Sequence, residues 1–371
     1  MNEISWYELE QPGQVDSPAL LIYKKRVAQN IQMMIRIAGG AERLVPHVKT
    51  HKMPEIVQMQ MEAGIRRFKC ATIAEAEMLA QAGARDIILA YQLTSPKAIR
   101  LLTLIRDYAD IRFSSLVDNM DSARLLNELS GNDEIIANVF IDIDNGMHRT
   151  GIAPGEKAFE LYRELQQLPY IFCQGLHVYD GHIRDRDFTV RKEKCEAAFE
   201  PVNTLARRII AAGFPAPMII AGGTPTFTVH ALRKGIFCSP GTCLLWDEGY
   251  AGQLAEQDFQ YAAVLLTRVI SKPRQGLITT DLGHKSVAAE NPLDKRIFFL
   301  NLSGYAITSQ SEEHLVVSVE DWEKIKVGDI LYGVAYHICP TVALYDEAQV
   351  VENGRLIAKW NIMARRKRIS V

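Results

Sequence analysis

The chain has 371 residues, of which 48% are hydrophobic and 23% are charged, the balance of an ordinary globular protein with room for two domains. Its formal net charge of −2, from 42 basic and 44 acidic side chains, gives no reason to expect a nucleic-acid or membrane partner. No apolar run approaches the roughly 20 residues that cross a bilayer, and no basic, signal-like segment opens the chain. We therefore expect a cytoplasmic protein whose six scattered cysteines are reduced thiols.

Eight short apolar runs, rich in Val, Ile and Phe, alternate with amphipathic helical patterns. The runs cover residues 44–48, 68–71, 86–91, 111–117, 137–144, 174–179, 218–221 and 235–239. Such runs are typical of strands that are buried on both faces. Their number and spacing predict an α/β fold, a (β/α)8 TIM barrel over residues 14–245. The alternative is an open doubly wound sheet, but no Gly-x-Gly-x-x-Gly follows an early strand.

The pattern changes after Trp246. Strand-like segments separated by Gly, Asn and Asp turns follow one another there, with no long helical pattern between them. They predict a mostly β second domain over residues 246–371. We expect residues 1–13 to join this domain through a strand over 4–9, and the chain to enter the barrel near Pro18.

The first apolar run ends in Lys49, which has His47 and His51 on either side. Catalytic groups of a (β/α)8 barrel lie at the carboxyl ends of its strands. A lysine on such a rigid, half-buried support loses its proton more easily than a surface lysine and can attack a carbonyl carbon. Lys49 is therefore the candidate nucleophile, and a solvated surface lysine is the alternative interpretation.

Glycines and threonines follow the seventh and eighth runs, at Gly222, Gly223 and Thr224 and at Gly241 and Thr242. Glycine lets backbone N–H groups approach a ligand closely, and the loops after strands seven and eight of this barrel commonly bind phosphate. A reactive lysine and a phosphate cradle together predict pyridoxal 5′-phosphate. A lysine-dependent aldolase acting on a sugar phosphate would need the same two features.

Two further side chains favour pyridoxal phosphate. Arg149, after the fifth run, could donate to the phenolic oxygen of the pyridoxal ring, and Tyr179, after the sixth, could contact the ring. The alternatives are an ion pair of Arg149 with Asp142 or Asp144 and simple packing of Tyr179 at the barrel end.

His337 and Cys339 stand two residues apart near the end of the chain. On an extended strand, residues two apart point to the same side, so the pair could chelate one metal ion. An imidazole and a thiolate favour zinc. A packed core pair is the alternative.

Several segments together resemble the D-threonine aldolase and D-serine dehydratase family, which are fold-type III pyridoxal-phosphate enzymes related to alanine racemase in the barrel. The segments are Asp16-Ser17-Pro18-Ala19-Leu20, Pro46-His47-Val48-Lys49-Thr50-His51-Lys52, Gly146-Met147-His148-Arg149-Thr150-Gly151, Gly222-Gly223-Thr224-Pro225-Thr226 and His337-Ile338-Cys339-Pro340-Thr341. The resemblance covers nearly the whole chain, and the lysine motif with the C-terminal His-x-Cys is highly specific to the group.

The resemblance implies a homodimer whose active site is completed near the interface of barrel and β domain. It makes Lys49 the Schiff-base lysine, places Arg149 and Tyr179 beside the ring, and assigns the glycine and threonine positions to the phosphate. His337 and Cys339 would hold a divalent metal near the β-hydroxyl of a D-amino acid. Zinc is the metal we expect, with manganese or magnesium as alternatives.

The resemblance leaves two reaction types open. By the resemblance, the family's aldolases typically have an acidic residue where Cys339 stands, and its dehydratases have cysteine there. In contrast, Pro240–Asp247 and Asp281–Lys285 look more like the aldolase branch. We favour the aldolase, in which His51 or His182 takes the proton of the β-hydroxyl. In a dehydratase, Lys49 would instead take the Cα proton. An amino-acid racemase and a non-catalytic pyridoxal-phosphate carrier are weaker alternatives.

Overall fold

The computed structural model describes residues 5–371, which form two compact units. The β unit contains the N-terminal residues up to Met33, Thr50–Met53 and Thr242–Arg365. The barrel unit contains Met34–Lys49, Pro54–Gly241 and Arg366–Val371. The chain passes from the barrel unit to the β unit after Lys49 and again after Gly241, two positions that the sequence assigns to cofactor binding.

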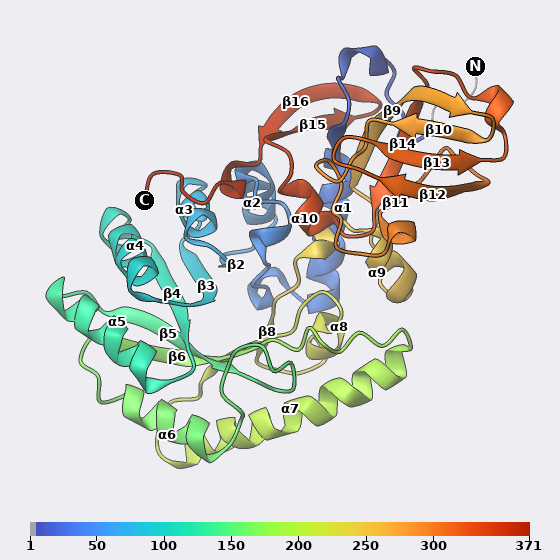
Figure 1. Cartoon of the computed structure of the whole chain (residues 1–371). Coiled ribbons are helices and arrows are strands. Elements are labelled where there is room, and N and C mark those ends of the chain that lie inside the picture. The colour runs from blue at the N-terminus through green and yellow to red at the C-terminus, as the bar shows by residue number, and fades with distance from the viewer. Residues whose placement is uncertain (1–4) are drawn as a thin grey trace. The chain divides into compact units, whose positions relative to one another are not determined.

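Seven parallel strands of the barrel unit pair in chain order (Figure 1). They are β2 (Arg67–Cys70), β3 (Asp86–Gln92), β4 (Arg112–Val117), β5 (Ala137–Ile143), β6 (Ile171–Val178), β7 (Met218–Ala221) and β8 (Ile236–Cys238). Side chains from several strands fill the interior between them, namely Val45, Ile88, Leu116, Phe140 and Ile220. All seven coincide closely with apolar runs of the sequence, which confirms the barrel-type fold.

The remaining run, residues 44–48, which is the first along the chain, joins the two edges of this sheet. Leu44 bridges Cys238 of β8, and His47 bridges Lys69 of β2, both in parallel register. The run forms only these two isolated bridges instead of a regular strand. Pro46 has no N–H to donate, and a 3-10 helix, Val48–Thr50, begins directly afterwards.

Helices follow the strands of the barrel unit and cover the outside of its sheet (Figure 1). They are α2 (Pro54–Glu62), α3 (Ile73–Gln81), α4 (Ser95–Asp107), α5 (Met120–Asn132), α6 (Glu156–Leu165), α7 (Phe188–Ala211) and α8 (Phe227–His230). Several begin at a capping side chain. For example, the side chain of Thr72 accepts from the Glu75 N–H at 3.1 Å at the start of α3.

The β unit is built on a nine-stranded sheet with the path β12-β13-β10-β9-β1-β15-β16, to which β14 adds by pairing with β9 and β11 by pairing with β14. The strands are β1 (Ala19–Tyr23), β9 (Ala263–Arg274), β10 (Leu277–Thr280), β11 (Ile297–Phe299), β12 (Tyr305–Gln310), β13 (Leu315–Val319), β14 (Ile330–Ala335), β15 (Glu347–Glu352) and β16 (Arg355–Asn361). Helix α9 (Glu248–Gln253) and helix α10 (Ile338–Val342) belong to the same unit, and α1 (Lys24–Ala38) follows β1.

The N-terminal segment differs from its prediction. Residues 5–9 form a turn, and Ile4 lies outside the described residues, so no strand spans this part of the described chain. The strand lies further on, at Ala19–Tyr23, which pairs antiparallel with β9 and parallel with β15. The chain therefore does not enter the barrel at Pro18. All five side chains of β1 are buried, and an apolar run of this kind does not reveal which sheet it joins.

Across residues 5–371, no helix has the length and apolar character needed to span a membrane. Within the described residues the six cysteines form no disulfide bond, and five of them are buried.

Candidate active site

Lys49 lies in the 3-10 helix that follows the first barrel segment. Its backbone N–H donates to Nδ1 of His47 at 3.2 Å, and its side chain is exposed. The amine is thus carried by a fixed backbone turn and is open to a carbonyl compound, as a nucleophile requires.

Arg149 and Tyr179 come together in the barrel unit. The guanidinium of Arg149 lies over the Tyr179 ring, 5.1 Å from its centroid. Asp144, the expected ion-pair alternative, instead binds His148, with 2.8 Å between Oδ2 and the ring Nδ1. Asp142 is bound by His177, Gln92 and Thr150. These carboxylates are therefore occupied by other partners, and Arg149 remains exposed at the mouth of the barrel.

Gly222 and Gly223, after β7, lie so close to neighbouring side chains that a larger residue would not fit at either position. Gly222 has φ +80°, and a Cβ there would lie 2.8 Å from Cδ2 of His230. A Cβ on Gly223 would lie 2.9 Å from Cε2 of Tyr179, so the missing side chain leaves room beside that ring. Thr224 accepts from the Gly241 N–H at 3.2 Å, which joins the two halves of the expected cradle. The cradle residues within the barrel unit thus form one loop cluster that fits a phosphate.

A buried cluster supports this loop. Thr226 Oγ1 donates to Asp180 at 2.5 Å and accepts from the Gly223 N–H at 3.3 Å. Asp180 also contacts His230 Nε2 at 2.8 Å, and Arg233 lies 3.0 Å from His230 Nδ1. Because arginine only donates, Nδ1 accepts and Nε2–H donates to Asp180.

Asp180, His230 and Cys195 also have the spacing of metal ligands. The hydrogen bonds above already use the free electron pair of His230, and the charge of Arg233 faces the cluster. Burial, together with the charge of Asp180, raises the pKa of Cys195 to about 12, so the thiol keeps its proton. The cluster is therefore a hydrogen-bonded support and a poor metal site.

Sequence reasoning missed a polar network inside the barrel. Lys69 of β2 is 2% exposed, and its Nζ lies 3.4 Å from Nε2 of His177. His177 Nδ1 lies 2.8 Å from Asp142 Oδ1. The signal was a lysine within the otherwise apolar run 68–71, and that signal is ambiguous because a lysine in a short strand is usually exposed.

His337 and Cys339 do not lie on an extended strand, so that part of the prediction is wrong. The strand β14 ends at Ala335, His337 is the N-cap of α10, and Cys339 lies in the first turn of that helix. Pro340 suits this turn because its missing N–H would have no intrahelical partner there. The two side chains nevertheless interact with each other.

Glu290 was also missed. Its Oε1 lies 2.5 Å from His337 Nδ1. Partial burial acts to lower the pKa of His337, but Cys339, Glu290 and Asp247 outweigh it and raise that pKa to about 9. A histidine whose Nδ1 is held by a carboxylate presents Nε2 outward, which is the usual arrangement of a metal-binding histidine. The donor set His337 and Cys339 therefore fits a divalent metal such as zinc.

Cys339 also lies beside both points where the chain passes from one unit to the other. Its Sγ is 3.2 Å from Oγ1 of Thr50, the residue after Lys49, and 3.4 Å from Oγ1 of Thr242, the residue after Gly241. Within the β unit, Cys339 thus lies next to two residues, each of which directly follows an expected cofactor-binding residue.

The two candidate bases have different environments. His51 is fully buried, its Nδ1 accepts from the Met53 N–H at 3.2 Å, and burial lowers its pKa to about 3. It is therefore a neutral ring with its proton on Nε2 and a poor proton acceptor. His182 is exposed, in the loop after β6, and its Nε2 would lie 3.0 Å from a Cβ on Gly146. His182 is the more accessible base.

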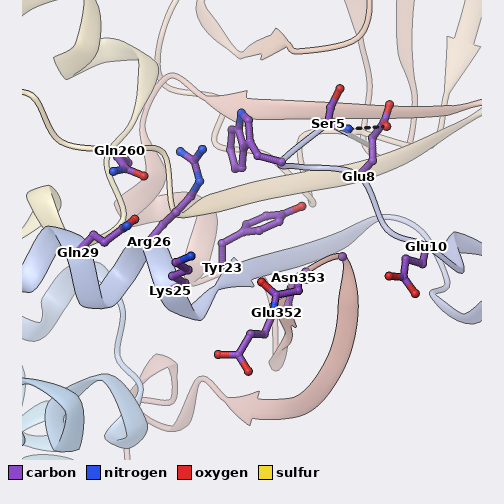
Figure 2. A pocket seen from close by; sticks show the side chains of 13 residues that line it. Ser5, Glu8, Glu10, Tyr23, Lys25, Arg26, Gln29, Gln260, Glu352 and Asn353 are labelled. Carbon is purple, nitrogen blue, oxygen red and sulfur yellow. Dashed lines mark hydrogen bonds between the residues drawn. The ribbon is translucent and has the colours of Figure 1, made fainter. Parts of the chain in front are cut away.

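A separate polar pocket lies on the β unit (Figure 2). The guanidinium of Arg26 lies 3.4 Å from the Trp6 ring centroid, and the Ser5 N–H donates to Glu8 at 3.1 Å. None of the residues expected from the sequence lines it. It is thus a feature of the surface apart from the expected chemistry.

The fold is a parallel eight-segment barrel joined to a mostly antiparallel β unit, with a lysine after the first barrel segment and a glycine cradle after the seventh. This combination defines the class of fold-type III pyridoxal-phosphate enzymes. Comparison with known proteins gives the family. Residues 22–247 match the alanine racemase N-terminal domain, and residues 262–351 match the putative serine dehydratase domain. The chain therefore belongs to the alanine racemase N-terminal domain family, in the branch that carries the second domain.

The relatives cover almost the whole chain. A D-threonine aldolase from Arthrobacter sp. is 29% identical, in an alignment that covers 96% of this chain and 95% of that protein. The solved D-threonine aldolase of Filomicrobium marinum is 25% identical, with a TM-score of 0.86 over 95% of this chain and 96% of that one. The D-threo-3-hydroxyaspartate dehydratase of Delftia sp. is 23% identical, and its structure gives a TM-score of 0.81 over 94% of this chain and 97% of that one. The expected family and the expected class, a pyridoxal-phosphate-dependent lyase, are confirmed.

Proposed function

We propose that the chain is a pyridoxal-phosphate- and divalent-metal-dependent lyase that cleaves D-β-hydroxy-α-amino acids to glycine and an aldehyde, as a D-threonine aldolase does. One observation carries the proposal. In the donor pair, His337 is held by Glu290, and Cys339 contacts Thr50, the residue that follows the expected nucleophile Lys49. A racemase has no use for such a pair, and a carrier has no use for a second domain that bears it.

In this proposal most of the residues that bind the cofactor belong to the barrel unit, and Thr242 belongs to the β unit. Lys49 holds the cofactor aldehyde, Arg149 and Tyr179 flank the ring, and the phosphate is bound by Gly222, Gly223, Thr224, Gly241 and Thr242. When bound, pyridoxal phosphate supplies a ring that accepts electrons from the bond being broken. The arrangement of Arg149 over Tyr179 and the space left by Gly223 support this assignment.

The β unit then supplies the metal ligands. His337 and Cys339 hold a divalent metal, whose chemistry is to lower the pKa of a hydroxyl bound to it. His182, as the more exposed of the two candidate histidines, takes the hydroxyl proton, and cleavage of the Cα–Cβ bond follows. Zinc is the proposed ion because one ligand is a thiolate, with manganese and magnesium as the alternatives to test.

A dehydratase is the second candidate, and Cys339 favours it. The resemblance associates cysteine at this position with the dehydratases, and the Delftia sp. dehydratase is among the relatives. A cysteine-to-alanine variant of a D-threo-3-hydroxyaspartate dehydratase has been solved in a metal-free form. In a dehydratase, Lys49 would take the Cα proton, and the products would be a 2-keto acid and ammonia. The aldolase remains our proposal because the Arthrobacter sp. aldolase is the more similar protein, at 29% against 23% identity.

Product analysis separates the two reactions. Purified enzyme loaded with pyridoxal phosphate and with zinc, manganese or magnesium in turn is incubated with D-threonine, D-serine and L-threonine. The proposal expects acetaldehyde and glycine from D-threonine alone. A 2-keto acid without acetaldehyde would establish the dehydratase, and L-allothreonine formed from D-threonine or L-serine formed from D-serine, without cleavage, would establish a racemase.

The lysine assignment has its own test. Borohydride reduction followed by peptide mass analysis should place the cofactor on Lys49, and Lys49→Ala should remove the yellow absorbance of the protein. Lys52→Ala, three residues away, is the matched control and should keep it. Labelling of any other lysine would refute the assignment. The homodimer implied by the resemblance stays a prediction, which sedimentation of the loaded enzyme can test.

A further inference from the structure

Lys69 is a lysine whose side chain is buried inside the barrel unit. It is 2% exposed on β2, in register with His47, and its N–H donates to Pro46 O at 2.9 Å. It thus lies on the strand beside the segment that ends, two residues later, in Lys49. A buried lysine usually needs a carboxylate close by, because removing its charge from water is costly.

The group that faces the Lys69 amine is a neutral ring nitrogen. The Asp142 carboxylate only accepts, so His177 carries its proton on Nδ1 and presents the electron pair of Nε2 to Lys69 at 3.4 Å. Burial, followed by the charge of Lys69, lowers the pKa of His177, which keeps the ring neutral. Asp142 stays ionised, because hydrogen bonds from His177, Thr150 and Gln92 outweigh its burial and lower its pKa.

Charges from several elements act on the Lys69 amine. Burial, with the charge of Lys49 as the next cause, lowers the pKa of Lys69 to about 7. Arg149 also lowers it, while Asp142 and Asp180 raise it, and the Tyr179 ring lies 5.6 Å away. The pKa of the Lys69 amine therefore lies near neutral pH, and the charge of Lys49 is one of the charges that lower it.

Such coupling acts in both directions. If the charge of Lys49 disfavours a proton on Lys69, then removing that charge favours one. An amine that attacks a carbonyl must first lose the proton of its ammonium form.

We propose that Lys69 is a proton store for Lys49, which takes up a proton when Lys49 loses its positive charge and releases it when the charge returns. One proton leaves one amine and one is gained by the other, so no further reactant is needed. The inference rests on the proposed role of Lys49. Lys69 would act as a positioning residue, through charge, because it is buried and does not line the pocket beside Arg149 and Tyr179.

The titration of Lys69 can be observed without the cofactor. In full-length protein with ¹³C at the lysine ε-carbon, one resonance should titrate between about pH 6 and 8, far below the ordinary lysine value of about 10.4. Lys69→Met should remove this resonance. Lys69→Arg should remove it too while keeping a cation, which makes the assignment secure if the methionine variant does not fold.

The decisive variant is Lys49→Met, which removes the neighbouring charge at an exposed position. It should raise the titration midpoint of the Lys69 resonance by about half a pH unit or more. Lys97→Met, which removes a cation of the barrel unit at α4, should leave the midpoint unchanged. The inference is wrong if no lysine titrates in the neutral range, or if Lys49→Met leaves the midpoint where it was.

Adding pyridoxal phosphate to the wild-type protein separates this inference from the proposed function. Its attachment to Lys49 should raise the midpoint in the same direction as Lys49→Met. A shift in the variant without any shift on adding the cofactor would support the coupled amines and count against Lys49 as the cofactor lysine. Attachment of the cofactor at Lys49 with an unchanged midpoint in both experiments would support Lys49 as the cofactor lysine and count against the coupled amines.

Discussion

At the scale of single residues, burial decides what each histidine can do. His51 and His337 both stand in motifs that a sequence reader would assign to chemistry, yet their environments push their pKa values in opposite directions. Burial lowers the pKa of His51 to about 3, whereas Cys339, Glu290 and Asp247 outweigh the burial of His337 and raise its pKa to about 9. The first is a neutral structural ring at neutral pH, and the second lies beside groups that suit a metal ion.

The buried ring of His51 predicts a loss of stability in acid. Its folded pKa, about 3, lies below the unfolded value of 6.5, so the unfolded chain binds the extra proton first. The stability contribution is present above pH 6.5 and is lost as the pH falls towards 3. At pH 5 the loss is about 2 kcal/mol. Urea unfolding measures the free energy of unfolding at pH 7 and at pH 5. The difference between the two values should be smaller for His51→Gln than for wild type, whereas His284→Gln, at an exposed position, should show the wild-type difference.

Glu290 is the residue through which the metal assignment is most easily tested. A carboxylate that orients a metal-binding histidine typically contributes about 10–100-fold to metal affinity. Glu290→Gln should therefore weaken zinc binding by about that factor, as measured by competition with a chelating dye. Glu312→Gln, which alters an exposed glutamate paired with Lys285 in the same unit, should not. Equal affinities for the two variants would place the metal elsewhere.

At the scale of elements, the loops that follow the strands carry the candidate site, and their shapes depend on glycine and on caps. The turn after β7 keeps its form because Gly222 adopts a left-handed backbone and Gly223 lies against Tyr179. The start of α10 is tied to α9 through Asp247, which accepts from the Tyr250 N–H at 3.0 Å and the Ile338 N–H at 3.1 Å. Neither the contact of Gly223 with Tyr179 nor the hydrogen bond from the Ile338 N–H to Asp247 is visible as a pattern in the sequence.

A methyl group at Gly223 should disturb the cofactor site more than the fold. The new Cβ would lie 2.9 Å from the Tyr179 ring, which must then turn away. We expect Gly223→Ala to weaken pyridoxal-phosphate binding about tenfold, or about 1.4 kcal/mol, in an absorbance titration. Gly155→Ala, whose Cβ meets nothing within 4 Å, is the control. An unchanged affinity in Gly223→Ala would remove this glycine from the cradle.

Asp247 should matter both for stability and for the metal. Asp247→Ala removes the cap of α9 and the bond to the start of α10, and the loss of a cap costs about 1–2 kcal/mol of unfolding free energy. It should also weaken metal binding, because the first turn that carries Cys339 loses its support. Asp187→Ala removes the cap of α7 in the barrel unit and should lower stability without changing metal affinity.

At the scale of the whole molecule, the candidate residues fall on two units that differ in chemistry. The lysine, the arginine–tyrosine pair and the glycine cradle belong to the barrel unit, and the His337–Cys339 pair belongs to the β unit. Cofactor binding and metal binding should therefore be separable.

Removal of the metal tests this separation. Dialysis against a chelator, or Cys339→Ala, should abolish cleavage of D-threonine while leaving the yellow absorbance of bound cofactor, and zinc should restore activity to the dialysed wild type only. Cys173→Ala changes a buried thiol of the barrel unit and should stay active with metal. Loss of the cofactor together with the metal would show that the two sites are not independent.

The sequence alone determined the order of elements and the family. Strands buried on both faces must be apolar throughout, and glycines at tight turns and the lysine motif keep a fixed order along the chain, so each leaves a local trace. These local traces were sufficient to predict the barrel, the later β strands and the positions of Lys49, Arg149, Tyr179 and the glycine pair.

Only the tertiary structure decided which sheet Ala19–Tyr23 joins, that Cys339 lies on a helical turn, and that Lys69, His177 and Glu290 belong beside the expected residues. An apolar run has the same pattern in either sheet, and a pairing between β2 and β6 or between Glu290 and His337 joins positions far apart in the chain. Burial and charge act through space, and their effect on a side chain is set by neighbours that no local pattern records.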